Sequence, residues 1–584
     1  MPVDYAGNSL DKARKVDINS NAQTFTDRVD NLDLNDFYSL SLRSRSSFNL
    51  NLDGLKADAD VALIRDANNN SQFDQGEVLS ASTHSGKQAE SINQILDAGT
   101  YYIRVYPDGN AITNYKLTVS ARPFDDTIST IFSSSANLPI NSTSGKTEVN
   151  VNSAIAPASP TNNINIVAGT LRADTFNFQS GFNRTIYIGN GNVDYGSGAR
   201  DFLNLSQIAS TSVTTNYADN LKGGVVYNAG NGNRLYDAIT FSDGSEILFQ
   251  GIETIKFQDK TVDLSVTPND PLFNQQWDLH ITGVNDAWRF TQGNDKVAIG
   301  ILDTGLGANS NGIHPDLRST TFVANNYFDE SATFSHGTRV EGTIAAASNN
   351  GVGIAGINWK SPVEMIDVIG GDSGDYDLVQ ATQALINGAG DRKLVVNLSL
   401  SGGSSPAFEK LVADNKDKVL FVIAAGNQDQ NTIASPASLA QTNNNVVAIG
   451  SSWGTKDWYG NAKTPGERIS YEDWWGSNTG EGLTLTAPSE FIATSATRTD
   501  SSATYGFGYY DRFNGTSAST AVVTGIASLV WSANPNLTAG QIKAILSETA
   551  YDLGTAGYDT VYGYGQVNAG AAVRRAEALD RGFA

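Results

Sequence analysis

The sequence predicts a multidomain protein in which two N-terminal all-β domains precede a larger α/β domain with a doubly wound parallel sheet. The chain has 584 residues, which is too long for one ordinary core. Short runs of alternating apolar and polar residues recur in the first part, and continuous apolar runs separated by helical segments fill the remainder. We expect a β domain at 1–122, a linker at 123–162, a second β domain at 163–264 and the α/β domain at 265–584.

Residues 1–122 are predicted to form a small β sandwich or jelly-roll. Apolar and polar residues alternate at 37–42 and 100–106, which buries one face of each strand and leaves the other in water. The segments NDFYSLSL at 35–42 and LDAGTYYIRVYP at 96–107 resemble the pre-peptidase C-terminal domain family. This resemblance implies an accessory domain of a secreted peptidase, although such domains usually follow the enzyme.

A segment inside this domain, 66–77, has the spacing of an EF-hand-type calcium loop. Oxygen-bearing side chains at loop positions 1, 3, 5, 9 and 12 let one short loop surround an ion that needs about six to eight oxygens. Ser71 stands at position 6, where glycine is usual. We expect calcium here, and the alternative is an Asn- and Asp-rich hairpin loop. The expected ligands are Asp66, Asn68, Asn70, Asp74 and Glu77.

The second β domain follows a stretch rich in Ser, Thr, Asn and Pro, which is typical of a linker. Its segments at 186–205 and 241–259 resemble degenerate hemolysin-type calcium-binding (RTX-like) modules, in which glycines allow tight turns and aspartates bind calcium. The Gly and Asp residues are out of a regular nine-residue phase, which favours a glycine-turned β domain over a calcium roll. These residues are Gly189, Gly191, Asp194, Gly196, Gly198 and Asp201.

Continuous apolar runs predict the α/β domain, because strands of a parallel sheet are buried on both faces. Helices are expected between them at 377–388 and 404–414. In such sheets ligands bind at the carboxyl ends of the strands. The expected strands are 296–302, 393–400, 419–425 and 445–450.

Composition narrows the function classes. The chain carries 39 basic and 61 acidic side chains, a net charge of −22, so we expect neither nucleic acid nor a membrane as a partner. It contains no cysteine, which excludes disulfides and thiol catalysis. The N-terminal MPVDYAGNSLDKARKV lacks the apolar core of a signal peptide. A histidine-based mechanism can use only His84, His280, His314 or His336.

Three motifs carry residues suited to acyl transfer. Asp303 directly follows the first expected strand of the α/β domain, at the carboxyl edge of the sheet. His336 lies 33 residues later in SHGTRVEGTIAA. Ser517, in FNGTSASTA, begins a helix expected over 517–533, where backbone N–H groups favour negative charge. Each motif has an ordinary alternative: a turn-forming aspartate, a structural histidine and a helix-capping serine.

Together these motifs resemble the subtilisin-like (subtilase, peptidase S8) family over 270–584, whose triad has the order Asp, His, Ser. The resemblance implies a serine endopeptidase with Asp303, His336 and Ser517 as the catalytic triad and an acyl-enzyme intermediate. It implies that the Asn427 side chain donates to the oxyanion. It also implies a strand and a loop that bind extended substrate, formed by Ser399, Leu400, Ser401, Gly402, Ala425 and Gly426, with Ser401 where glycine is usual.

Departures from the common family pattern bear on specificity. Arg339 replaces a histidine, and Ser517-Ala518-Ser519 replaces Ser-Met-Ala. These features resemble the kexin/furin-like branch, which cleaves after basic residues, so a basic residue before the scissile bond (P1) is one expectation. No acidic pocket motif accompanies them. The arrangement with accessory domains in front resembles cyanobacterial calcium-dependent proteases of this family.

A calcium site in the protease domain is also implied by the resemblance. HPDL at 314–317 and SNNGVGI at 348–354 are similar to segments around the family's strong calcium site. Asp316 and Asn350 would supply side-chain oxygens. Backbone carbonyls would come from Ser348, Val352 and Ile354. The alternative is a plain turn.

We therefore expect a calcium-stabilised, secreted or cell-surface serine endopeptidase that acts on proteins or peptides. One alternative is a calcium-dependent surface or binding protein with an inert protease fold. Another hypothesis makes the protein a zymogen whose first ~265 residues are an inhibitory or chaperoning pro-region, removed by self-cleavage within 259–275.

Overall fold

The computed structural model describes residues 5–16, 23–31, 33–43, 46–66, 70–73, 77–83, 86–96, 98–109, 111–123, 164–220, 222–230, 232–309, 312–318, 335–369, 377–498 and 505–583. The chain forms two compact units, Met1–Val151 and Asn152–Ala584. The second unit holds the second β domain and the α/β domain together. Almost all of the expected linker, 124–162, lies outside the described residues.

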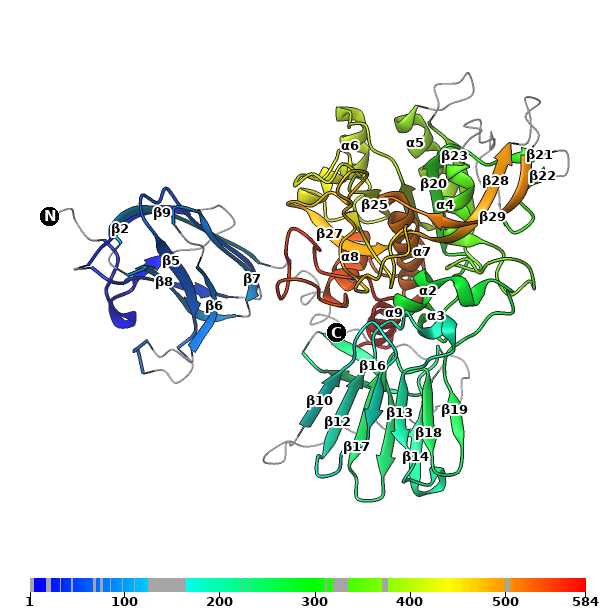
Figure 1. Cartoon of the computed structure of the whole chain (residues 1–584), viewed down its shortest axis with the longest axis horizontal. Coiled ribbons are helices and arrows are strands. Elements are labelled where there is room, and N and C mark those ends of the chain that lie inside the picture. The colour runs from blue at the N-terminus through cyan, green and yellow to red at the C-terminus, as the bar shows by residue number, and fades with distance from the viewer. Residues whose placement is uncertain are drawn as a thin grey trace, which may run out of the picture. The chain divides into compact units, whose positions relative to one another are not determined.

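The N-terminal unit contains a sandwich of two sheets, as its alternating sequence predicts (Figure 1). Its elements are η1 (Leu10–Lys12), β1 (Arg14–Val16), β2 (Gln23–Val29), β3 (Asp36–Leu42), β4 (Ser46–Asp53), β5 (Ala59–Ile64), β6 (Val78–Ser82), β7 (Glu90–Leu96), β8 (Gly99–Pro107) and β9 (Thr113–Pro123). The strand orders are β1-β3-β8-β5-β6 and β2-β9-β4-β7. Tyr38 pairs with Ile103 and Leu40 with Tyr101, and all four lie buried between the sheets.

The second β domain, called the roll below, has two sheets: β10 to β13 alternate between them, and β14, β15 and β17 then pair antiparallel with β16 in the first sheet. Its elements are β10 (Ile164–Ala168), β11 (Thr175–Asn177), β12 (Arg184–Ile188), η3 (Tyr195–Ser197), β13 (Phe202–Leu205), η4 (Ser210–Ser212), β14 (Val213–Asn216), β15 (Val225–Asn228), β16 (Asn233–Phe241), β17 (Glu246–Gln250), β18 (Thr254–Phe257) and β19 (Thr261–Asp263). Strands β10, β12 and β17 are parallel neighbours in one sheet, and β11, β13 and β18 are parallel neighbours in the other.

Three carboxylates lie at equivalent positions of successive coils of the roll, each directly before a strand. The Asp174 N–H donates to the Asp201 carboxylate at 2.7 Å, and the Asp201 N–H donates to the Glu253 carboxylate. Burial raises the pKa of Asp201 and of Glu253. These side chains therefore join neighbouring coils by hydrogen bonds to the backbone.

The α/β domain is built on one six-stranded parallel sheet with the order β23-β20-β24-β25-β26-β27. The strands are β20 (Val297–Asp303), β23 (Val363–Asp367), β24 (Lys393–Leu398), β25 (Val419–Ala424), β26 (Val446–Ser452) and β27 (Leu483–Pro488). The four strands expected from the sequence are confirmed as β20, β24, β25 and β26. Every residue of β20 and β25 is buried, as a parallel sheet covered on both faces requires.

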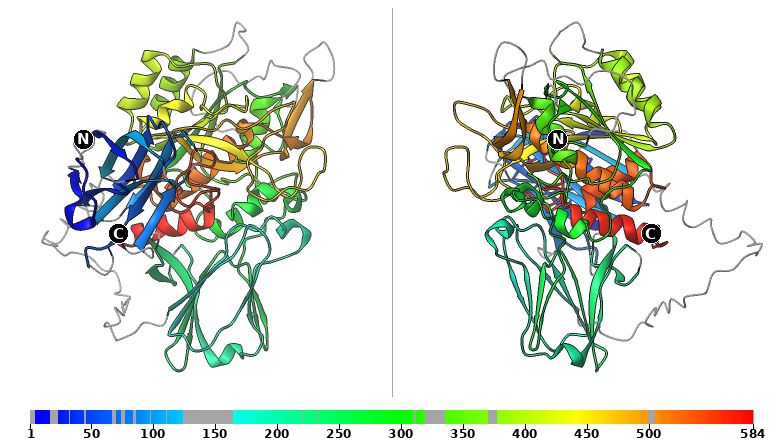
Figure 2. Two further views of the ribbon diagram at one scale, coloured as in Figure 1. Left: turned by 60° about the vertical axis from the view of Figure 1, so that its left-hand side comes forward. Right: turned by 90° about the vertical axis from the view of Figure 1, so that its right-hand side faces the viewer.

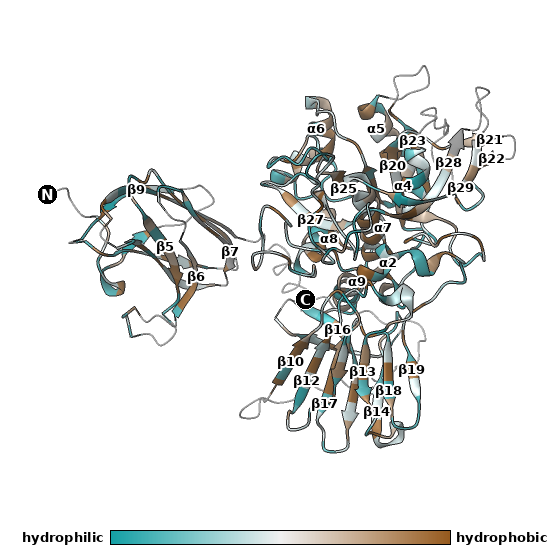
Figure 3. Ribbon diagram, viewed as in Figure 1, coloured by the Kyte–Doolittle hydropathy of each residue, from teal (hydrophilic) through white to brown (hydrophobic). Residues whose placement is uncertain are grey.

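Helices cover both faces of this sheet (Figure 1). The remaining elements are η5 (Phe273–Gln275), α2 (Trp277–Ile281), α3 (Val284–Ala287), β21 (Ala308–Asn309), β22 (Gly312–Ile313), α4 (His336–Ala345), α5 (Leu378–Ala389), α6 (Pro406–Asp414), η6 (Ala437–Gln441), β28 (Phe491–Arg498), β29 (Tyr505–Phe513), α7 (Thr516–Ala533), α8 (Ala539–Glu548) and α9 (Ala569–Asp580). The two expected helices are confirmed as α5 and α6, and α7 is buried along its whole length. Apolar residues recur along the strands of the roll and of the sandwich as well as in α7 (Figure 3). No helix in the described ranges combines the length and hydropathy needed to cross a bilayer.

The roll and the α/β domain share one hydrophobic core, and both views of Figure 2 show the roll against α9. Tyr195, Ala218 and Leu235 of the roll belong to the cluster that also buries the inner side of α7 and α9. The Tyr195 ring centroid lies 4.7 Å from that of His280. The Asn192 N–H donates to the His280 carbonyl at 2.9 Å.

Two glycines of the roll permit this close approach. A Cβ on Gly191 would lie 1.5 Å from the Ile281 carbonyl oxygen, and one on Gly196 would lie 1.9 Å from that of Asn274. The glycine-rich segment therefore fits the roll against α2 and η5, which explains glycines that do not follow a nine-residue repeat.

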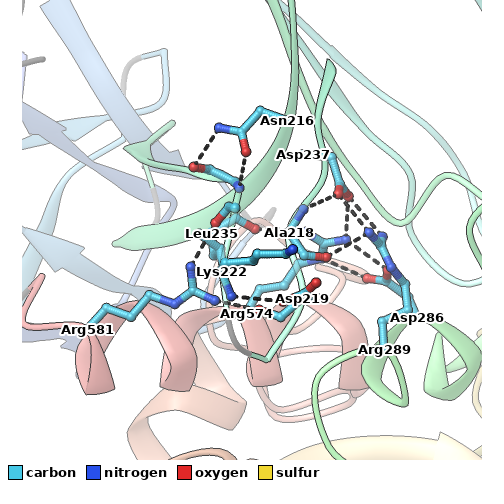
Figure 4. Close-up of polar contacts among 12 residues, drawn as sticks. Asn216, Ala218, Asp219, Lys222, Leu235, Asp237, Asp286, Arg289, Arg574 and Arg581 are labelled. Atoms are coloured by element: carbon cyan, nitrogen blue, oxygen red, sulfur yellow. Dashed lines mark hydrogen bonds and ion pairs between the residues drawn. The ribbon is translucent and has the colours of Figure 1, made fainter. Parts of the chain in front are cut away.

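A buried network of four charges joins the two parts (Figure 4). The Asp237 carboxylate, from β16, accepts from Arg289 at 2.7 and 2.9 Å and from Arg574 of α9 at 2.7 Å. Asp286 of α3 accepts from the same two arginines. Burial opposes ionisation, but Arg574 and Arg289 lower the pKa of Asp286 to about 2. The network is thus fully charged and its opposite charges are equal in number.

Candidate active site

The carboxyl end of β20 presents Asp303 in the interior. Its side chain is fully buried, and its Oδ1 lies 2.6 Å from Nδ1 of His336. The same oxygen accepts the Thr304 N–H at 2.8 Å. A carboxylate in this position fixes the orientation of the imidazole ring and stabilises its protonated form.

His336 is the first residue of α4. The Gly337 N–H donates to the Thr304 hydroxyl at 3.0 Å, which fixes the helix start beside Asp303. A Cβ on Gly337 would lie 2.1 Å from the Gly305 carbonyl oxygen, so only glycine permits this approach. The Phe513 ring contacts the imidazole edge-on at 5.8 Å between centroids.

Ser517 lies in the first turn of α7. Gly515 precedes that turn at φ 87°, a backbone conformation that favours glycine. The Ser517 hydroxyl donates to the Ser399 carbonyl at 3.0 Å, and the Ser399 hydroxyl donates to the Ser517 carbonyl at 2.9 Å. The nucleophile candidate is therefore tied to the predicted substrate strand, at a helix N-terminus that favours an oxyanion.

Asn427 follows β25 at the same edge of the sheet. Its Oδ1 accepts from the Thr516 N–H at 2.8 Å and from the Thr516 hydroxyl at 2.9 Å. This leaves its amide nitrogen directed toward Gly515, where a Cβ would lie only 3.2 Å away. An amide N–H held beside Gly515, two residues before Ser517, is suited to an oxyanion that forms at the nucleophile.

The predicted substrate-binding residues form two adjoining segments. Ser399, Ala425 and Gly426 are buried and Leu400 is partly buried, whereas Ser401 and Gly402 are exposed. The Ser435 carbonyl accepts the Gly402 N–H at 3.2 Å, and the Ala434 N–H donates to Ala425 at 2.8 Å. Residues 434–435 thus connect the two segments, which places one continuous wall beside Ser517.

The other residues singled out in the sequence have structural contacts. The Arg339 guanidinium lies 4.2 Å from the Tyr510 ring centroid, as in a cation–π contact. His314 accepts the Asp316 N–H at 3.1 Å and lies 2.9 Å from the Gly508 carbonyl. His280 is buried beneath the roll, and His84 lies outside the described residues.

The predicted calcium residues of the protease domain lie together, and the side-chain oxygens of Asp316 and Asn350 already accept protein donors. Asp316 accepts from the Asn350 amide at 3.0 Å, the Ile354 N–H at 3.0 Å and the Tyr509 hydroxyl at 3.2 Å. Burial raises the pKa of Asp316 to about 6. The Ser348 hydroxyl donates within the same loop, and the Val352 N–H donates to Asn350. The Tyr509 hydroxyl thus takes one hydrogen-bonding position of the Asp316 carboxylate, and a cation bound there would have to displace it.

The segment 66–77, where calcium was also predicted, is described at Asp66, at 70–73 and at Glu77. Asp66 accepts the N–H groups of Asn70 at 3.1 Å and Ser71 at 2.9 Å. Ser71 has φ 57°, the conformation for which EF-hand loops use glycine. Glu77 is buried at loop position 12, and Asn68 and Asp74 lie outside the described residues. Within the described ranges no three His, Asp or Glu side chains converge as a metal cluster.

Sequence reasoning missed the residues that orient the candidate site: Thr304, Phe513, Gly515 and Thr516. Thr304 and Thr516 adjoin Asp303 and Ser517, so each predicted motif contained the signal. The residues that they contact are distant in the sequence, and no local sequence pattern indicates such contacts.

Comparison with known proteins agrees with this arrangement. The sequence matches the subtilase family over residues 294–565 and the bacterial pre-peptidase C-terminal domain over residues 34–107. Subtilisin BL of Lederbergia lenta is 32% identical over 283 residues, which cover 48% of this chain and 91% of that protein. The halolysin-like extracellular serine protease Nep of Natrialba magadii is 29% identical over 316 residues, 52% of each chain. An extracellular protease of Xanthomonas campestris pv. campestris is 28% identical over 367 residues, 54% of this chain and 58% of that protein. The chain thus spans about half the length of the last two relatives. It belongs to the subtilase family.

Proposed function

We propose that this chain is a serine endopeptidase that hydrolyses peptide bonds in proteins through an acyl-enzyme. The observation that carries the proposal is the 2.6 Å contact between Asp303 and His336 at the sheet edge where α7 presents Ser517 beside Asn427. A buried aspartate, an imidazole, a serine hydroxyl and an amide donor are the groups that acyl transfer needs.

In this mechanism Ser517 Oγ attacks the peptide carbonyl carbon while His336 takes the hydroxyl proton. Asp303 holds the imidazole by Nδ1 and stabilises its positive charge. The Asn427 amide and the N–H groups at the start of α7 stabilise the oxyanion. His336 then protonates the leaving amine, and water attacks the acyl-enzyme to release the acid and restore Ser517 Oγ–H.

The wall of 399–402 and 425–426 supports binding of an extended protein or peptide chain on the acyl side. A basic P1 residue is proposed on the sequence resemblance to the kexin/furin-like branch. Secretion is proposed because the relatives above are named as extracellular proteases.

Calcium is proposed to stabilise the protein at the 66–77 loop, where Asp66, Asn70 and Glu77 supply oxygens together with the predicted ligands Asn68 and Asp74. At Asp316, calcium would first have to displace the Tyr509 hydroxyl, so we assign that site lower priority.

We further propose that the roll stays with the protease after any maturation. The proposed cleavage segment 259–275 is held in place: the Thr267 hydroxyl lies 2.8 Å from that of Tyr195, and Asp270 accepts the Asn349 N–H at 2.7 Å. A cut there would leave the shared core and the buried charges unaltered, so the roll would remain bound.

The test is hydrolysis of casein and of peptides with Arg or Leu at P1 by the full chain and by Ser517→Ala. Hydrolysis that is lost in Ser517→Ala supports the proposal, and the peptide pair decides the P1 preference. Absence of hydrolysis by the native chain, even after its N-terminal unit is removed, would favour a binding protein with an inert protease fold.

A further inference from the structure

An unusually aromatic segment connects β26 to β27. Residues 453–475, called the aromatic loop below, contain four of the chain's eight tryptophans and two tyrosines. Trp453 and Trp475 are buried with Ile469 in a small core of their own. Trp474 packs against neighbouring rings, with centroids 5.1 Å from Trp458 and 5.2 Å from Tyr471. The loop therefore has a packed aromatic core of its own. A simple connection between two strands does not need such a core.

Two rings of this unit remain open to solvent. Tyr459 is 69% exposed and Trp474 is 47% exposed, and their ring centroids are 6.4 Å apart. Large aromatic side chains are favourable to bury, and contiguous exposed apolar surface marks sites of interaction. The pair thus offers a preformed apolar contact surface.

One end of the aromatic loop is bound to the segment that carries the oxyanion donor. The Gly476 N–H, directly after the loop, donates to the Asn427 carbonyl at 3.3 Å. Arg468 and Ser470 donate to the Asp429 carboxylate at 2.6 and 2.7 Å. The loop therefore lies immediately beside the Asn427 side of the candidate active site.

The aromatic loop is also bound to the hairpin that leads to the nucleophile and to the residue directly before that hairpin. Arg512 donates to the Trp458 carbonyl at 2.9 Å, and its guanidinium lies 5.1 Å from the Trp458 ring centroid. The Tyr471 hydroxyl lies 2.7 and 2.9 Å from the carboxylate oxygens of Glu490. Arg512 directly precedes Phe513, whose ring contacts His336.

These contacts place the loop on one side of the scissile bond. The acyl part of a substrate would follow 399–402, which is bound to 435. In the described part of the chain, the polar contacts of the aromatic loop with the site go to 427–429, to Glu490 directly before β28 and to Arg512 of β29, not to 399–402. The loop therefore flanks the side on which the amine leaves.

We propose that the aromatic loop forms the leaving-group side of the substrate cleft, and that Trp474 and Tyr459 select large apolar or aromatic residues in the first two positions after the scissile bond. This inference rests on the proposed endopeptidase activity. It adds a specificity determinant to the residues that perform the reaction.

Acyl transfer to added amines tests this directly. An ester substrate acylates Ser517, and an amine then attacks the ester carbonyl; the new C–N bond replaces the C–O bond to Ser517, and the amine proton passes by way of His336 to Ser517 Oγ. The ratio of amide to acid product measures binding on the leaving-group side alone. The amines would be the amides of Phe-Gly, Gly-Phe and Gly-Gly.

We expect native protein to favour at least one Phe-containing amine over Gly-Gly amide by roughly tenfold, the size expected for one aromatic contact plus burial of the ring. Trp474→Ala or Tyr459→Ala should remove most of this preference, and Trp474→Phe should restore it. Phe583→Ala, which removes a 43% exposed ring outside the loop, is the matched control and should leave the preference intact.

Two failures are distinguishable. If the native chain hydrolyses no ester, the proposed function is wrong. If it hydrolyses the ester but transfers the acyl group equally to Phe and Gly amines, or if both alanine variants keep the preference, the role of the aromatic loop is wrong.

Discussion

Asp237→Asn is expected to destabilise the α/β domain, although Asp237 lies in the roll. Its carboxylate accepts three hydrogen bonds from Arg289 and Arg574 and a fourth from the Ala218 N–H at 2.8 Å. Asparagine has nearly the same shape but no charge. The substitution would leave two guanidinium groups and one carboxylate, Asp286, in the interior.

The expected magnitude follows from burial. The side chains of Asp237 and Arg574 are 1% and 0% exposed, so water cannot replace the missing charge. Removing one partner of such a buried pair costs about 3–5 kcal/mol. This range raises the equilibrium constant of unfolding by about two to nearly four orders of magnitude.

Tryptophan fluorescence during urea unfolding is a suitable assay. All eight tryptophans lie between Trp277 and Trp531, so the signal comes from the α/β domain and not from the roll or the sandwich. The full chain would be compared in a Ser517→Ala background, which prevents self-digestion. Asp295→Asn, at an exposed position of the α/β domain, is the matched control.

A large decrease in the transition midpoint for Asp237→Asn, with little change for Asp295→Asn, is the predicted result. An unchanged tryptophan transition in Asp237→Asn would refute the reasoning, because the roll would then unfold independently of the protease domain.

Three further predictions concern catalysis, pH and calcium. Asn427→Ala should lower kcat by about 10²–10³ with little change in KM, because the amide stabilises the oxyanion and not the bound substrate. The kinetics of peptide hydrolysis measure both constants, and an effect on KM alone would contradict this prediction. Burial, with a contribution from Glu364, raises the pKa of Glu341 to about 8. The folded state then keeps a proton that the unfolded state loses, so stability decreases as pH rises from about 4.5 to about 8. Glu341→Gln should therefore gain thermal stability relative to the native chain as the pH rises over that interval. A difference in thermal stability between the two proteins that does not change with pH would contradict this prediction. In a luminescence titration, terbium should bind the native chain more tightly than it binds Asp66→Asn. Asp316→Asn, which changes the other candidate calcium site, is the comparison. Equal terbium binding by the native chain and Asp66→Asn would contradict a calcium site in the 66–77 loop.

Much of the α/β sheet was predictable, because doubly buried parallel strands are continuous apolar runs. The two strands that were missed break that rule. In β23 the carboxylates of Glu364 and Asp367 interrupt the apolar run, and in β27 Thr484 and Thr486 alternate with leucines. All four side chains are buried, so tertiary packing, not local pattern, determines these strands.

The candidate site was predictable where its chemistry lies within short motifs, as for Asp303, His336 and Ser517. The contacts that orient it were not, since Thr516 holds Asn427 from 89 residues away in the chain. The contacts between the roll and the α/β domain were even less predictable from the sequence. Asp237 and Arg574 are 337 residues apart and lie in segments of different periodicity, so no sequence pattern pairs them.

The reaction of Ser517 with an organophosphorus fluoridate is the most direct measurement of the proposed mechanism. We predict one phosphoryl group per chain, located on Ser517 by peptide mass spectrometry and formed in proportion to the loss of peptidase activity, with no such adduct in His336→Ala. Peptide hydrolysis that persists without modification of Ser517, or inactivation that accompanies modification of a different serine, would contradict the assignment.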